Sequence, residues 1–225
     1  MGRIYIICGF YGSGKTEFCV NLAMKLAESG EAPVTIADLD VINPYFRSRE
    51  KEALLAVKGI EIMGNALENN LGQDLPAVSY AFASRIVRGE NVILDLAGGE
   101  AGVKLLAPCY SAIGNSKAPV EFLCVVNRFR PETDSAEKMA GFVRRINGMS
   151  KLGITGLVNN GHMLRETVAS HVLESQEAAL EAADMLGLPL RYTQIRRDIY
   201  EGISDKIVSK DVLIFEKLAM RESWQ

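Results

Sequence analysis

Residues near the start of the sequence form a short glycine-rich run with apolar neighbours on both sides. The run reads Gly-Phe-Tyr-Gly-Ser-Gly-Lys-Thr from Gly9 to Thr16 and fits the pattern G-x-x-x-x-G-K-[ST]. An apolar segment, Ile4 to Cys8, precedes it, and a stretch with helical spacing follows from Lys15 to Glu28. This order places backbone N–H groups and the positive end of a helix around an anion. The sequence therefore predicts a phosphate-binding P-loop.

Each residue type in this loop has a chemical task. We expect Lys15 to reach the β- and γ-phosphates of a nucleotide and to act in catalysis, and we expect the Thr16 hydroxyl to bind Mg²⁺. The other residues expected to contact the nucleotide here are Gly9, Tyr11, Gly12, Ser13, Gly14 and Glu17. The alternative is a glycine-rich turn that binds nothing, but the flanking strand and helix favour the phosphate site.

Apolar runs alternate with amphipathic stretches along the rest of the chain. The predicted strands are Ile4 to Cys8, Val34 to Ala37, Val92 to Leu96, Glu121 to Val126, Ile154 to Val158 and Leu190 to Thr193, with Gly59 to Met63 as an extra edge strand. The predicted helices are Lys15 to Glu28, Ala77 to Arg88, Thr133 to Met149, Arg165 to Met185 and Lys206 to Met220. This alternation predicts an α/β chain, a three-layer αβα sandwich with a mostly parallel sheet, as one P-loop nucleotide-binding domain over residues 1–225.

The composition excludes several classes of protein. A formal net charge of −3 argues against a dedicated nucleic-acid binder, which usually carries a basic excess. No apolar stretch approaches the roughly 20 residues of a membrane span, so we expect none. Four cysteines without C-x-x-C spacing and only two histidines argue against a zinc site. Met1 leads directly into the first apolar run, so we expect no secretory leader and a reduced, cytoplasmic protein.

Acidic residues follow the second and third of the main predicted strands. Because ligands of open parallel sheets lie beyond the carboxyl ends of the strands, these residues should lie beside the P-loop. Asp95 ends an apolar strand, as a Walker-B residue that holds Mg²⁺ does, and it begins a D-x-x-G sequence in which the Gly98 N–H would contact a γ-phosphate. Asp38 and Asp40 would support the metal and orient water. The alternatives are a helix N-cap for Asp95 and a solvated turn for the other two.

With these motifs placed, the chain resembles the MinD/ParA/CobQ-like P-loop ATPases (SIMIBI class). The shared features are the P-loop, the Asp-Leu-Asp sequence from Asp38, the D-x-x-G sequence and an Asn at a later strand end, Asn159. The resemblance implies that Asp40 positions the hydrolytic water, that Asp38 supports Mg²⁺ and that Asn159 contacts adenine. It also places adenine near the loop from Ile195 to Asp198.

The chain departs from that family in one respect, because Phe10 occupies the place of a signature lysine that reaches across a dimer. The Walker A sequence is therefore atypical, and a nucleotide-sandwich dimer that uses this lysine is in doubt. Arg47 or Arg49 would supply a substitute cation if the segment after Asp40 is a switch loop. The alternative is that both arginines belong to a solvated helix start.

The sequence favours ATP over GTP. Guanine specificity in related GTPases depends on N-K-x-D, whose Asp accepts hydrogen bonds from the base. Here Val126 is followed by Asn-Arg-Phe-Arg, so Arg130 stands in the place of that Asp, and a cation cannot accept those bonds.

The function predicted from these residues is Mg²⁺-dependent binding and slow hydrolysis of ATP to ADP, used as a switch that acts on a client protein or a homodimer partner. The rival is a small-molecule kinase or ligase resembling dethiobiotin synthetase or the CobB/CobQ enzymes, with a substrate pocket lined by residues 64–76 and 98–102. A nucleotide-binding module that no longer turns over is a third possibility. Basal hydrolysis without substrate separates the switch from the kinase.

Overall fold

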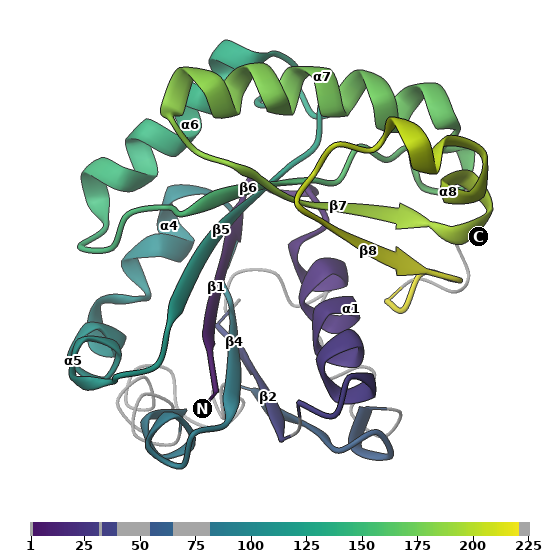
Figure 1. The fold of residues 1–225 in the computed structure, drawn as a ribbon. Helices are drawn as coiled ribbons and strands as arrows, with labels where there is room; N and C mark the ends of the chain where they lie inside the picture. The colour runs from purple at the N-terminus through teal and green to yellow at the C-terminus, as the bar shows by residue number, and fades with distance from the viewer. Residues whose placement is uncertain (1, 32, 40–54, 65–81, 221–225) are drawn as a thin grey trace.

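The computed structural model describes residues 2–31, 33–39, 55–64 and 82–220, whose strands form one parallel sheet (Figure 1). The strand order in this 8-stranded sheet is β3-β2-β4-β1-β5-β6-β7-β8. The strands are β1 (Ile4–Gly9), β2 (Val34–Asp38), β3 (Ile60–Gly64), β4 (Asn91–Asp95), β5 (Val120–Val126), β6 (Gly156–Asn159), β7 (Leu190–Arg196) and β8 (Asp211–Phe215). Because β1 lies between β4 and β5, the loop that follows it is near the middle of the row formed by the carboxyl ends of the strands.

Helices cover both faces of the sheet (Figure 1). They are α1 (Lys15–Glu28), α4 (Gly99–Lys104), α5 (Tyr110–Asn115), α6 (Ala136–Met149), α7 (Ala169–Leu186) and α8 (Arg197–Ile203). Short 3₁₀ turns occur at Ala107–Cys109, Leu164–Glu166 and Ser204–Lys206. Among the described residues, no helix has both the length and the apolar character that a membrane crossing requires.

The side chains of β1 alternate between two apolar cores. Ile4, Ile6 and Cys8 join the core on the face covered by α4 to α7, whereas Tyr5 and Ile7 join the core beneath α1. Successive side chains of a strand point to opposite faces, so a continuous apolar run is what a strand with helices on both sides requires. Both faces of β1 are buried, and this fixes the direction in which the chain leaves the strand at Gly9.

Most of the predicted elements are present, and the edge strand at 59–63 is confirmed as β3. The helix predicted from Lys15 to Glu28 matches α1 residue for residue. Of the helix predicted over 77–88, the structure describes 82–88 and is helical from 82 to 87. The helix predicted from Lys206 to Met220 is wrong, because Asp211–Phe215 forms strand β8 on the outer side of β7. Parallel pairing with β7 prevails over the helical spacing of that segment.

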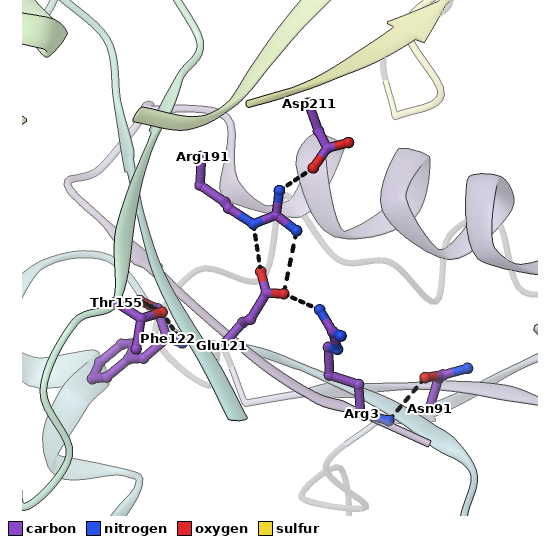
Figure 2. Close-up of polar contacts among 7 residues, drawn as sticks. All are labelled: Arg3, Asn91, Glu121, Phe122, Thr155, Arg191 and Asp211. Atoms are coloured by element: carbon purple, nitrogen blue, oxygen red, sulfur yellow. Dashed lines mark hydrogen bonds and ion pairs between the residues drawn. The ribbon is translucent and has the colours of Figure 1, made fainter. Parts of the chain in front are cut away.

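Charged side chains form ion pairs at the amino ends of the strands, on the side of the sheet opposite the P-loop (Figure 2). Glu121 of β5 pairs with Arg3, which precedes β1, and with Arg191 of β7 at 3.2 Å, and Arg191 also pairs with Asp211 of β8. Thr155 accepts a 3.0 Å hydrogen bond from the Phe122 N–H. This chain of contacts links the starts of β1, β5, β7 and β8.

Candidate functional site

The P-loop turns sharply between β1 and α1. Gly14 has a φ of +87° and caps the N-terminus of α1, a conformation that glycine adopts without strain. A Cβ atom on Gly14 would lie 2.1 Å from the Asn160 Nδ2 atom, so no larger residue fits. Lys15 is the first helical residue and only 7% exposed, and its Nζ donates a 3.2 Å hydrogen bond to the Phe10 carbonyl. The lysine of the P-loop is thus hydrogen-bonded to the main chain of the same loop.

Side chains from the ends of β5 and β6 hold the loop from one side. Asn160 donates a 2.7 Å hydrogen bond from Nδ2 to the Ser13 carbonyl, and its Oδ1 accepts one of 3.2 Å from Gln194 on β7. Arg130, in the turn after β5, donates from Nε to the Gly12 carbonyl at 2.9 Å. No described carboxylate forms an ion pair with Arg130, so its charge adds to that of Lys15.

His162 lies beside these groups. Its Nε2 atom would be 3.3 Å from a Cβ on Gly14, and its main chain is bonded to Asn127, whose Nδ2 donates to the His162 carbonyl at 3.2 Å. Burial, reinforced by the charge of Arg130, lowers the pKa of His162 to about 4. The imidazole is therefore neutral at physiological pH.

Two buried carboxylates lie at the carboxyl ends of neighbouring strands. Asp38 of β2 is opposite Asp95 of β4 in the sheet register, and they are 4% and 1% exposed. Burial, together with the neighbouring Asp95, raises the pKa of the Cys19 thiol on α1 well above its usual range. Asp38 and Lys15 also act on Cys19 electrostatically, so all four groups lie close together.

The loop after β4 passes beneath an aromatic ring. Gly98 precedes α4, and a Cβ on it would lie 2.5 to 2.8 Å from the ring atoms Cδ1, Cε1 and Cγ of Tyr11. The Tyr11 ring thus packs directly on the Gly98 backbone, while the side of the ring away from it leaves Tyr11 42% exposed. Tyr11 also meets the Phe10 ring edge-on at a centroid distance of 5.8 Å. The P-loop and the D-x-x-G loop are therefore in direct contact.

A cavity of about 630 Å³ extends from the P-loop along the ends of β6 and β7. Its lining comes from the P-loop and α1, from the segments that follow β5 and β6, from the ends of β7 and β8 and the residues after them, and from Val172 of α7. The residues are Tyr11, Gly12, Gly14, Lys15, Thr16, Glu17, Arg130, Asn160, Gly161, His162, Leu164, Arg165, Thr167, Val172, Gln194, Ile195, Arg196, Arg197, Asp198, Ile199, Glu201, Phe215, Glu216, Lys217, Leu218 and Met220.

The predicted site residues fall into distinct groups. Tyr11, Gly12, Gly14, Lys15, Thr16 and Glu17 line the cavity, and so does the segment from Ile195 to Asp198 that was expected near adenine. Gly9 and Ser13 shape the loop behind it. Asp38, Asp95 and Gly98 lie at the neighbouring strand ends. Asp40, Arg47, Arg49 and residues 65–76 are outside the described residues.

Two predicted contacts look different in the structure. Asn159 is fully buried, and its Nδ2 donates to the Val172 carbonyl at 3.2 Å, whereas the next residue, Asn160, lines the cavity. Glu17 lines the cavity, but its carboxylate accepts hydrogen bonds from the N–H groups of Ala219 and Met220. Sequence reasoning missed Arg130, Asn160 and the segment after β8 as parts of this site. Only Arg130 gave a signal, as the cation that replaces an expected Asp.

No protein-family model matches this chain, and no curated protein matches it in sequence. Solved structures do match it in fold. The cell division protein FtsY of Thermotoga maritima has a TM-score of 0.60 at 19% identity over 87% of this chain and 62% of its own. Chloroplast FtsY of Physcomitrella patens has a TM-score of 0.59 at 22% identity over 86% of this chain and 58% of its own.

A third match is the signal recognition particle 54 kDa protein of Aeropyrum pernix K1, solved in complex with GDP. Its TM-score is 0.60 at 19% identity, over 97% of this chain and 43% of that protein. The chain thus spans less than two thirds of the length of these structures. At such identities the likeness establishes the fold, and the predicted three-layer αβα P-loop NTPase fold with a parallel sheet is confirmed.

Proposed function

We propose that this chain binds ATP with Mg²⁺ and hydrolyses it slowly, and that the change from ATP to ADP switches its contact with a partner protein. The observation that carries the proposal is the P-loop itself, which opens with Lys15 and Thr16 into a cavity of about 630 Å³. Ligand pockets for small molecules typically measure about 300 to 1,000 Å³, so a nucleotide is of suitable size. The GDP bound to the Aeropyrum pernix protein supports a nucleotide ligand in this fold.

The phosphates belong at the P-loop. The N-terminus of α1, a helix of 14 residues, presents backbone N–H groups to the loop, and Lys15 adds a full positive charge. Arg130 supplies a second cation on the rim of the loop, bonded to Gly12. These groups stabilise the negative charge of a transferring phosphoryl group. Arg130 also provides the cation that Phe10 does not supply, a role for which Arg47 and Arg49 were the candidates in the sequence.

The donor set fits Mg²⁺. Thr16 offers a hydroxyl, and Asp38 and Asp95 offer carboxylates, which are the oxygen ligands that Mg²⁺ takes up in proteins. Two carboxylates buried side by side repel each other, and a divalent cation next to them would offset that repulsion. When bound, Mg²⁺ would neutralise charge on the β- and γ-phosphates. Asp40 would orient the attacking water, and the Gly98 N–H would contact the γ-phosphate.

The base would lie in the part of the cavity formed by β7 and α8. Gln194 and Asp198 line it and offer polar groups, and Ile195 and Ile199 offer apolar faces. Asn160 is the asparagine at the end of β6 that faces the cavity, and it takes the role that was assigned to Asn159. Arg130 bonds the P-loop and cannot accept hydrogen bonds from guanine, which supports ATP over GTP.

The contact between Tyr11 and Gly98 supports a switch. A γ-phosphate bound by Gly98 would move the loop that lies under the Tyr11 ring, so the exposed ring would report the nucleotide state at the surface. The partner that binds such a surface would be a client protein or a second copy of the chain.

The test is a calorimetric titration with Mg²⁺ and either ATP or GTP, run beside Lys15→Ala, with ADP formation measured on the same samples. We expect Mg²⁺-dependent ATP binding that the variant loses, weaker binding of GTP, and slow formation of ADP by the unaltered protein. Binding without any ADP would favour the kinase or ligase, or the inactive module. Absence of nucleotide binding by the unaltered protein would refute the proposal.

A further inference from the structure

The segment that follows β8 forms one wall of the cavity. Phe215, Glu216, Lys217, Leu218 and Met220 all line it. Met220 is 6% exposed and packs in the core beneath α1, so the end of this segment is anchored rather than loose. Residues from the start of the chain and from its last described part therefore enclose the same space.

A carboxylate next to the P-loop holds this wall in place. Glu17 directly follows Thr16, and its Oε1 accepts a 2.7 Å hydrogen bond from the Ala219 N–H, while its Oε2 accepts one of 2.9 Å from the Met220 N–H. Asn21, one turn further along α1, donates to Glu17 Oε1 at 3.0 Å. Hydrogen bonds to an ionised acceptor are stronger than neutral ones, and two successive N–H groups fix the direction of the segment.

The other side of the segment is tied to α8 and β7. Glu216 pairs with Arg197, the first residue of α8. The segment thus spans the distance from α1 to α8, across the part of the cavity that lies outside the P-loop. Lys25 strengthens the same arrangement by donating from Nζ to the Val212 carbonyl of β8 at 3.0 Å.

The chemistry of this wall differs from that of the P-loop. The loop offers N–H groups and cations, which suit phosphates. The wall offers Phe215, Leu218 and Met220, and the surfaces of β7 and α7 in the same cavity offer Ile195 and Val172. A nucleoside has an apolar, planar base, and apolar side chains on both sides are the surfaces that bind such a ring.

We propose that residues 215–220 form a nucleoside-binding wall, positioned by Glu17, that sets the affinity for the base and ribose while the P-loop sets that for the phosphates. This inference rests on the proposed nucleotide function. Because Phe215, Leu218 and Met220 line the cavity, binding of a base there and docking of the segment stabilise each other, and such coupling is reciprocal.

The variants Glu17→Gln and Ala219→Pro test the wall from its two sides. The glutamine replaces one accepting oxygen by an NH₂ group that faces an N–H donor, and the proline removes the Ala219 N–H without changing α1. We expect Mg²⁺·ATP affinity to fall about tenfold or more in both. The matched control is Glu28→Gln, at the exposed far end of the same helix, which should bind ATP as the unaltered protein does. Thermal unfolding identifies any variant that has lost its fold.

Hydrogen exchange of the unaltered protein gives an independent readout. We expect Mg²⁺·ATP to slow amide exchange at Ala219 and Met220, and Mg²⁺·tripolyphosphate, which has no base, to leave it unchanged. Equal protection by tripolyphosphate would overturn the inference, because the phosphates alone would then order the segment. Unchanged ATP affinity in folded Glu17→Gln and Ala219→Pro would overturn it as well. If the unaltered protein bound no nucleotide, the proposed function itself would fail, which is a different result.

Discussion

Asn160 joins the end of β6 to the P-loop, because its side-chain Nδ2 donates a 2.7 Å hydrogen bond to the main-chain carbonyl of Ser13. The two residues are 147 positions apart in the sequence. The Asn160 side chain also accepts a hydrogen bond from Gln194, so β7, β6 and the P-loop form one connected frame. A loop that binds phosphate through its backbone needs that backbone to be fixed before the ligand arrives, since ordering it on binding would weaken the affinity.

Replacing Asn160 by Ala should loosen this frame. The residue is 4% exposed, and the substitution leaves the buried Ser13 carbonyl without this donor. We expect a loss of about 1–3 kcal/mol in the free energy of unfolding and a fall of about tenfold in Mg²⁺·ATP affinity. Urea unfolding and calorimetry measure the two effects. Asn115→Ala, on an exposed part of α5, is the control that should change neither.

Arg130→Ala tests the cation on the rim of the P-loop. Removing its charge should weaken Mg²⁺·ATP binding about tenfold and reduce the dependence of that affinity on salt, because one charge fewer then attracts the phosphates. Arg128→Ala is the matched control, since Arg128 belongs to the same turn but does not line the cavity. An equal loss of affinity in both variants would indicate a general effect of net charge and contradict a specific contact.

Most of the fold could be predicted from the sequence, and β1 and α1 show why. Ile4 to Cys8 is apolar on both faces, and the P-loop motif marks where the strand ends and the helix begins, so local pattern and tertiary structure agree. Strand β8 was mistaken for a helix because the apolar residues from Val208 to Leu218 also fit helical spacing. The pairing with β7, in which Tyr192 lies opposite Asp211, decides the matter, and a local pattern does not show it.

The site was predictable only where a motif defines it. Asn159 and Asn160 are neighbours at the end of β6 and both are buried, but only Asn160 lines the cavity, and the pattern of the sequence does not show which of the two does so. The bonds from Arg130 to Gly12 and from Ala219 to Glu17 join segments more than 100 positions apart. No spacing in the sequence encodes contacts of that kind.

The contact between Tyr11 and Gly98 can be tested without any ligand. Tyr11→Ala removes the ring that covers the Gly98 backbone, so amide exchange in the loop from Leu96 to Gly99 should become faster in the nucleotide-free protein. Tyr11→Phe keeps the ring and should exchange as the unaltered protein does. Unchanged exchange in the alanine variant would show that the ring does not hold the loop, and it would remove this part of the proposed switch.

His162 predicts how stability depends on pH. Its pKa is about 4 in the folded protein because of burial and the charge of Arg130, compared with 6.5 for a solvated imidazole. Between these two values the unfolded chain binds a proton that the folded chain does not, so stability from this group is present above pH 6.5 and is lost as the pH falls towards 4. After allowance for partial exposure, the loss should be about 1–2 kcal/mol.

His162→Gln has no group that titrates there, so its free energy of unfolding should decline less over this interval. Parallel pH profiles for the two proteins would contradict the assignment to His162, and Arg130→Ala should move the transition of the imidazole to higher pH because it removes the neighbouring positive charge.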